Sequence, residues 1–103
     1  MLFRSENISP REIEEAIHEH PAVAEVAVVG APDPLFVETI CAVVALKPGA
    51  RATEEEIKQH TAKYVTKFKV PSSVLFIPEL PKNPTGKIQK REIRDQLPEL
   101  TEN

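Results

Sequence analysis

Two short runs of small apolar residues constrain the fold of this chain most strongly. Val23–Val29 is dominated by Val and Ala and is followed by Gly30, and Thr39–Leu46 is rich in Val and Ile. Short apolar runs that are bounded by turn-forming residues predict buried strands. About ten residues join the two runs, which favours a wide antiparallel connection over a tight hairpin.

The first helix is predicted by its starting signal. Ser9 is a capping residue, Pro10 suits the first helical position, and Glu12 completes the pattern of a capping box. The helix should end near His20, because Pro21 disfavours helical geometry in the residue before it.

A second helix begins after Thr53, where Glu56 is placed to reach back and complete another capping box. Its inward face is predicted from helical spacing. That face comprises Ile57, Thr61, Tyr64 and Phe68. The segment should end at Pro71.

A short third strand is predicted over Ser73–Ile77, and a last helix should carry Ile88, Ile93 and Leu97 before Pro98 closes it. The expected order is therefore α-β-β-α-β-loop-α. Such an order predicts an α+β sandwich, with a three-stranded mixed sheet and three helices packed over it.

Length and composition favour one small globular domain. The chain has 103 residues, of which 41% are hydrophobic and 28% charged. No apolar run approaches the ~18 residues of a membrane span, and no secretory signal is expected. The single cysteine, Cys41, is predicted to be a buried apolar residue, which suits a reducing intracellular setting. Residues 1–5 resemble a linker remnant or vector-derived sequence, which leaves 6–103 as the domain.

The charge of the chain is unevenly placed. Two arginines against eight acids give residues 1–46 a net charge of −6, whereas eight cations against two acids give residues 63–94 a charge of +6. The overall charge of −3 argues against a nucleic-acid partner. The basic segment indicates a local anionic partner or, equally, a solvated face with ordinary lysines.

The loop before the last helix has the strongest chemical signal. Lys87 follows Gly86 directly, and Pro81 and Pro84 restrict the loop around them. A phosphate-binding P-loop is excluded, because Pro81 stands where its first Gly is required and Ile88 follows the Lys. The residues alone leave two interpretations, a surface turn with a solvated Lys or a cation for an anionic oxygen.

The chain offers no partner for catalysis by this Lys. Its histidines, His18, His20 and His60, lack the spacing of a metal site, so no metal site is predicted. No nucleophile and base are paired by pattern. The loop is therefore expected to complete an active site that lies largely on another domain.

Four segments together resemble the C-terminal domain of the adenylate-forming enzymes, most closely acyl-CoA synthetases. The loop matches the signature Pro-x-x-x-x-Gly-Lys-Ile, and the other segments match in order and spacing. The four segments are Glu6–Glu14, Val28–Asp33, Phe68–Pro71 and Pro81–Arg94. The resemblance covers nearly the whole chain.

This resemblance implies a mobile lid on a two-step, AMP-forming acid–thiol ligase. A large N-terminal adenylation domain binds ATP and a carboxylic acid, and CoA or a carrier thiol accepts the acyl group after the lid rotates. ATP, Mg and CoA are implied for the full-length enzyme, and no cofactor for the lid alone. The resemblance further implies fatty acid metabolism, a cytoplasmic location, no membrane span, and no activity of the isolated domain.

The resemblance also implies roles for single residues. Lys87 is expected to be the catalytic Lys of adenylation, supported in its loop by Pro81, Pro84, Thr85 and Gly86. Glu6 and Asn7 would line the thiol tunnel. CoA phosphates or acids of the large domain are the contacts suggested for Lys69, Lys90, Arg91 and Arg94.

Some positions depart from the family pattern. Arg4 and Ser5 replace a usual Gly-Gly pair, the hinge residue expected upstream is absent, and Val37 replaces a Gly that many members have. Two alternatives therefore stay open beside the lid domain. One is a stand-alone regulatory module that binds an anion or an acidic protein, and the other is a degenerate remnant of such a ligase.

Overall fold

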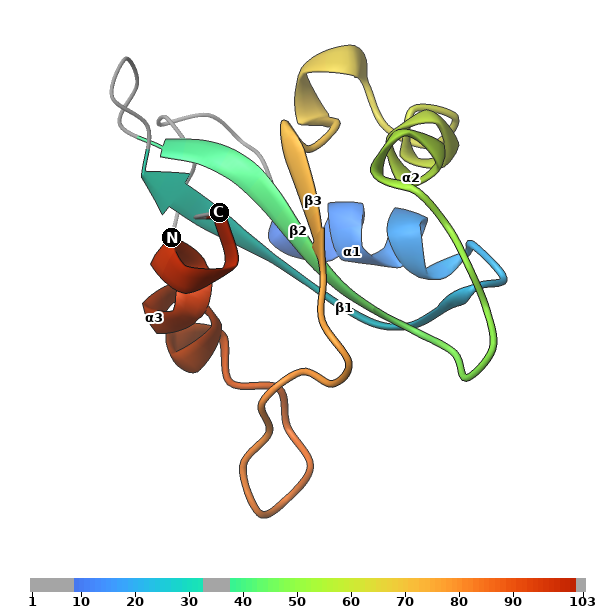
Figure 1. The fold of residues 1–103 in the computed structure, drawn as a ribbon. Coiled ribbons are helices and arrows are strands. Elements are labelled where there is room, and N and C mark those ends of the chain that lie inside the picture. Colours follow the sequence, from blue (N-terminus) through green and yellow to red (C-terminus); the bar gives the residue numbers. More distant parts are fainter. Residues whose placement is uncertain (1–8, 33–37, 102–103) are drawn as a thin grey trace.

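The computed structural model of the chain describes residues 9–32 and 38–101. Its elements follow the predicted order, with one additional short 3-10 helix, η1. They are α1 (Pro10–His18), β1 (Val23–Pro32), β2 (Glu38–Leu46), α2 (Glu54–Thr61), η1 (Lys67–Lys69), β3 (Ser73–Phe76) and α3 (Lys90–Thr101). The α+β class is confirmed (Figure 1). The predictions for residues 1–5, Glu6, Asn7 and Val37 lie outside the described residues.

The sheet is mixed, as predicted, in the order β1-β2-β3. β1 pairs antiparallel with β2, whereas β2 pairs parallel with β3. Pairing continues past the buried Gly30 to Pro32 opposite Glu38, so only residues 33–37 join the two strands. The expected ten-residue connection was wrong, because strand pairing extends into the turn-like sequence at both ends.

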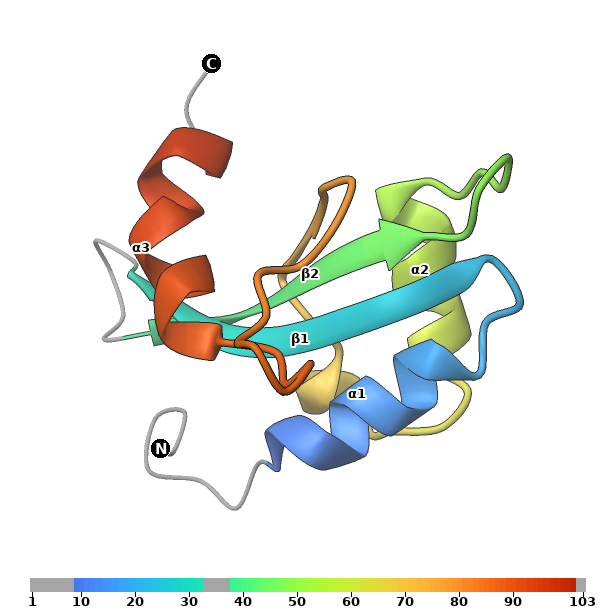
Figure 2. The same ribbon diagram turned by 90° about the horizontal axis from the view of Figure 1, so that it is seen from below.

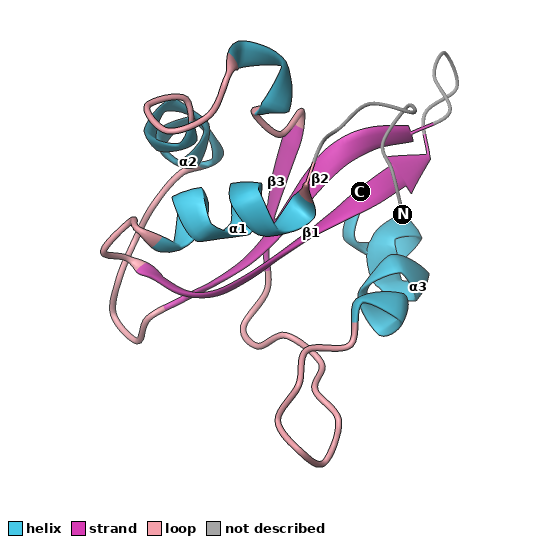
Figure 3. Ribbon diagram, turned by 180° about the vertical axis from the view of Figure 1, so that it is seen from behind, coloured by secondary structure: helices cyan, strands magenta, loops and turns pink. Residues whose placement is uncertain are grey.

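Helices cover both faces of this sheet, and the side chains of each strand alternate between them. On one face α1 and α2 pack through Ile13, Ile17 and Ile57. On the other face α3 packs through Ile93 and Leu97. Figure 2 shows α1 and α3 on opposite sides of β1, and Figure 3 shows α1 and α2 together from behind. The sheet is therefore the central layer, and α3 alone among the described helices covers its second face.

The predicted inward face of the second helix is confirmed at two residues and wrong at Tyr64, and the side chain of Phe68 lies outside the described part of the structure. Ile57 and Thr61 are buried, but Tyr64 is 56% exposed and α2 has already ended. Bonds from Lys63 N–H to His60 O and from Tyr64 N–H to Thr61 O tighten the chain to a period of three residues. This change of period turns Tyr64 outward.

The prediction that Pro98 ends the last helix was wrong. α3 continues through this residue to Thr101. Proline has no N–H to donate and normally disfavours a helix interior. Leu97 is 3% exposed against the sheet, and we attribute the continuation to this packing, which holds the segment in place.

One of the two predicted capping boxes forms completely. Thr53 N–H donates to Glu56 Oε1 at 2.8 Å, and Glu56 N–H donates to Thr53 Oγ1 at 3.1 Å. At α1 the Ser9 hydroxyl accepts from Glu12 N–H, but the Glu12 carboxylate pairs with Lys69 at 3.0 Å. The predicted box at Ser9 was therefore wrong, because a long-range ion pair takes the glutamate.

Candidate functional site

The loop predicted to carry chemistry is a small ordered hairpin between β3 and α3. Lys82 and Ile88 form an antiparallel bridge, and Gln89 N–H donates to Pro81 O at 2.9 Å. The hairpin extends away from the sheet and from the helices (Figures 1 and 3). It therefore presents its tip to whatever lies beside this domain.

Asn83 organises the tip of this hairpin. Its side-chain Oδ1 accepts three hydrogen bonds, from Thr85 N–H at 3.1 Å, Thr85 Oγ1 at 2.7 Å and Lys87 N–H at 2.9 Å. Its own N–H donates to Lys87 O at 2.9 Å, and its carbonyl accepts from Gly86 N–H at 2.8 Å. All of these bonds join Asn83 to residues within the next four positions of the chain, so they hold the tip of the hairpin locally.

Sequence reasoning missed this role of Asn83. A signal was present, because asparagine side chains commonly accept from the backbone two residues ahead and so form Asx turns. The predicted supports occupy the same turn: Pro84 and Thr85 are exposed there, and Gly86 has a φ of +90°, which favours glycine. Pro81 lies at the base, where its carbonyl accepts from Gln89.

Lys87 leaves the hairpin with its side chain in solvent. Both of its backbone polar groups are bonded to Asn83. Among residues 9–32 and 38–101, no acid pairs with the Lys87 amine. The site thus combines a fixed backbone with an available cation.

Lys82 stabilises the base of the hairpin. Its amine lies 2.7 Å from Glu25 Oε2 on β1 and donates to Leu80 O at 3.1 Å. The hydrogen bond to Glu25 raises the pKa of Lys82 above its ordinary value, because the carboxylate stabilises the charged amine. Glu25 also accepts from Leu80 N–H at 3.4 Å, which joins the hairpin base to the sheet twice.

Two of the four cations suggested for CoA or interdomain contacts form ion pairs with acids of α1. Lys69 pairs with Glu12 at 3.0 Å, and Lys90 pairs with Glu14 at 2.7 Å. The other two cations, Arg91 and Arg94, are exposed on α3. The structure therefore gives Lys69 and Lys90 a part in joining later segments to α1.

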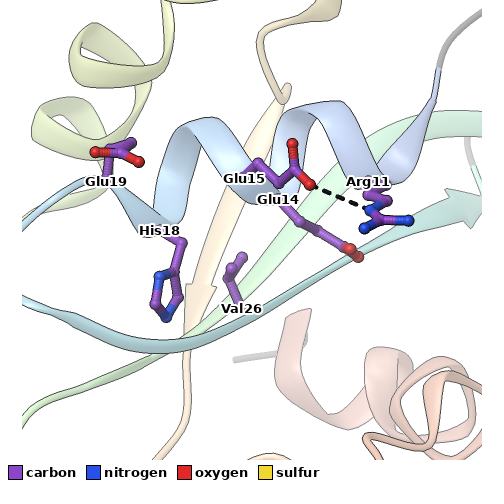
Figure 4. A pocket seen from close by; sticks show the side chains of 6 residues that line it. All are labelled: Arg11, Glu14, Glu15, His18, Glu19 and Val26. Carbon is purple, nitrogen blue, oxygen red and sulfur yellow. Dashed lines mark hydrogen bonds and ion pairs between the residues drawn. The ribbon is translucent and has the colours of Figure 1, made fainter.

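A shallow hollow lies between α1 and β1, with a volume of about 460 Å³ (Figure 4). It is lined by Arg11, Glu14, Glu15, His18, Glu19 and Val26. Arg11 is paired with Glu15 at 3.1 Å, and Glu14 with Lys90 at 2.7 Å, so the lining has no unpaired Lys or Arg to bind an anion. Such a lining disfavours a phosphate, and Lys87 takes no part in it.

The described residues contain no group of three His, Cys, Asp or Glu side chains that could hold a metal ion. Within the same residues, no helix is both long and apolar enough to span a membrane. The hairpin is the candidate site of the described part, and the class that the fold and this site define is a small α+β domain with an exposed lysine on an ordered hairpin.

Comparison with known proteins identifies this class. The profile of the AMP-binding enzyme C-terminal domain matches residues 12–87. A mitochondrial medium-chain acyl-CoA ligase, ACSF2 of Bos taurus, is 43% identical over 94% of this chain. A sulfoacetate–CoA ligase of Cupriavidus necator is 42% identical over 82% of the chain. The crystal structure of ATP-bound MatB from Rhodopseudomonas palustris superposes with a TM-score of 0.85, at 35% identity over 94% of the chain.

This chain therefore belongs to the AMP-binding enzyme C-terminal domain family. It spans 16% of the bovine ligase, 17% of the sulfoacetate ligase and 19% of the MatB chain.

Proposed function

We propose that this chain is the mobile C-terminal lid of an AMP-forming acyl-CoA synthetase. In the first step a carboxylate oxygen attacks the α-phosphate of ATP, which releases pyrophosphate and leaves an acyl-adenylate. In the second step the CoA sulfur attacks the acyl carbon, which forms the thioester and releases AMP. Rotation of the lid between these steps would bring the hairpin to the reacting groups and then withdraw it.

Lys87 supplies the cation of the first step. Negative charge gathers on the phosphoryl oxygens during transfer, and a positioned ammonium group stabilises it. One observation carries this proposal: an exposed lysine without an internal acid among the described residues stands on an ordered hairpin.

The remaining parts of the site belong to a large N-terminal adenylation domain. ATP and Mg²⁺ are assigned to that domain, because this chain spans only 16% of the bovine ligase and 19% of the ATP-bound MatB chain. The lid alone is expected to be inactive. Glu6 and Asn7, which lie outside the described residues, are assigned to the thiol tunnel by the family resemblance alone.

The acid substrate is set outside this domain. The bovine and Cupriavidus relatives are named for a medium-chain acyl group and for sulfoacetate, although their identities to this chain are 43% and 42%. The two relatives are named for very different acids, yet their identities to this chain are nearly equal. We infer from this that the lid does not select the acid. Both names specify CoA, which favours CoA over a carrier protein.

The compartment stays a prediction. The sequence analysis expects the cytoplasm, whereas the bovine relative is named as mitochondrial. Cell fractionation of the source organism decides between these two locations.

The rival interpretation as an anion-binding module receives less support from the structure. Such a module would use the basic segment as a patch, but Lys69, Lys82 and Lys90 are each paired with an acid of the same domain. A remnant without function is disfavoured too, since the backbone N–H and carbonyl of Lys87 both form hydrogen bonds within an ordered hairpin.

The test uses Lys87→Ala in the full-length protein that carries this domain. We expect adenylation, measured by exchange of labelled pyrophosphate into ATP, to fall by about 10²–10³-fold because a charge-stabilising donor is lost. Thioester formation from supplied acyl-adenylate should be retained. Lys63→Ala removes another exposed lysine and is the matched control. Equal loss of both half-reactions would contradict the proposal.

A further inference from the structure

We infer that Asn83 is a positioning residue for adenylation, which holds the backbone of Lys87 through its side-chain oxygen. The inference rests on the proposed function of Lys87 and adds a residue that acts through it. A lysine has a long flexible stem, so the direction of its charge depends on how firmly its backbone is held. In this hairpin two bonds of that support come from Asn83, four positions upstream, and Gln89 Nε2 adds one weaker bond to Lys87 O at 3.3 Å.

The geometry fixes which end of the Asn83 amide is involved. Two of the three groups that contact Oδ1 are backbone N–H groups, of Thr85 and Lys87, and these can only donate. The oxygen of the amide, and not its NH₂ group, therefore faces the turn. Any replacement that keeps an acceptor oxygen at this place can preserve both bonds.

Asn83 also bonds the other polar group of the Lys87 backbone. Lys87 N–H donates to Asn83 Oδ1 at 2.9 Å, while Lys87 O accepts from Asn83 N–H at 2.9 Å. Loss of the side-chain oxygen would free one of these two attachments and leave the other. The hairpin would then stay closed, but the peptide before Lys87 could rotate.

The contribution of Asn83 is therefore to catalysis more than to folding. Its bonds lie at an exposed tip, outside both apolar clusters of the core. Water can replace a partner there, so the fold should survive. A displaced reacting group, by contrast, costs rate steeply, because catalysis depends on orientation at the scale of about 1 Å.

The activity test compares Asn83→Leu, which removes the acceptor at similar size, with Asn83→Asp, which keeps an acceptor oxygen. In the full-length enzyme N83L should lower kcat for adenylation roughly tenfold or more, with KM for ATP unchanged. N83D should recover most of the rate, and thioester formation from supplied adenylate should be unaffected in both. Gln59→Leu makes a similar amide-to-alkyl change on exposed α2 and should alter nothing.

A second readout does not depend on activity. Amide hydrogen exchange of the 103-residue chain, followed by NMR, should show Thr85 and Lys87 N–H protected in the wild type and in N83D. Both should exchange rapidly in N83L, while core amides such as that of Val43 stay protected. Unchanged exchange at Thr85 and Lys87 in N83L would overturn the inference.

The two proposals can fail separately. If K87A is inactive in adenylation while N83L keeps the full rate, Asn83 does not position Lys87, and the proposed function stands. If K87A keeps adenylation, the proposed function and the catalytic part of this inference are both overturned. Equal loss of both half-reactions in N83L would also contradict a positioning role.

Discussion

Gly86 and Gly49 have the same backbone requirement in different surroundings. Their φ angles are +90° and +77°, and a Cβ added at either residue would meet nothing within 4 Å. Substitution at either position is therefore opposed by backbone strain alone. Gly86 precedes the proposed catalytic Lys, whereas Gly49 lies in the turn after β2.

This pair separates stability from function. Gly86→Ala and Gly49→Ala should each lower the free energy of unfolding by about 1–2 kcal/mol, the usual penalty for a left-handed alanine. Only Gly86→Ala should reduce adenylation by the full-length enzyme. Chemical denaturation and pyrophosphate exchange measure the two effects. A similar loss of adenylation in both variants would show that strain at Gly86 has no special consequence for Lys87.

At the scale of the elements, each of the two edge strands, β1 and β3, donates a backbone N–H to a glutamate of a neighbouring helix. Glu14 on α1 accepts from Val28 N–H of β1 at 2.8 Å. Glu54 on α2 accepts from Val74 N–H of β3 at 3.0 Å. Each carboxylate thus satisfies a donor that an open sheet edge would otherwise leave available for pairing with another chain.

Glu14 is the stronger of these ties, because it also pairs with Lys90 of α3 at 2.7 Å, whereas Glu54 pairs with Lys58 of its own helix at 3.4 Å. Glu14→Ala should lower the free energy of unfolding by about 1–3 kcal/mol, since a charged partner of a buried backbone N–H is removed. Glu15→Ala is the matched control: its pair with Arg11 is exposed, and a change within about 0.5 kcal/mol is expected. Equal effects in urea denaturation would count against the role given to Glu14.

Elements with local causes were predictable from the sequence. The capping box at Thr53 depends on two residues that are three positions apart in the chain. The apolar strands were predictable because their own composition favours buried strands. The errors at Glu12, Tyr64 and Pro98 arose where other interactions decide. Glu12 is taken by Lys69, which lies 57 residues away in the chain, and Leu97 is packed on a distant sheet.

The candidate site was predictable to a similar extent. Lys87 and Gly86 belong to a recognisable sequence signature, and the resemblance to a known family implies the role that is proposed for them. The attachments of the hairpin were not predictable, because the pair between Lys82 and Glu25 depends on how β1 and the loop meet in space. Asn83 is the exception, since its turn chemistry is local and could have been recognised.

For the whole molecule, the central layer contains a probe of unfolding. Cys41 is the single cysteine and is fully buried on β2. Burial raises the pKa of the Cys41 thiol, and a hydrogen bond with Ser73 partly offsets this shift. The thiolate, which is the reactive form, is therefore both scarce and inaccessible in the folded chain.

Labelling of Cys41 should consequently require opening of the sheet. At neutral pH a thiol reagent should react with the folded chain at least ~10³-fold more slowly than with the denatured chain, given a typical domain stability. Sub-denaturing urea should accelerate the reaction. A rate within about tenfold of the denatured chain would show that β2 is exposed by a local opening that costs little.

The attachment of the hairpin at both ends has a mechanical consequence. Leu80 before it and Ile93 after it are buried in the same cluster, on the α3 face of the sheet. Sheet and hairpin therefore turn together, and the hairpin acts as a lever arm in the proposed rotation. Its tip travels further than the core, so a small error in the final angle is magnified at the Lys87 amine. The contacts that stop the rotation must accordingly lie close to the hairpin if they are to set the position of that charge.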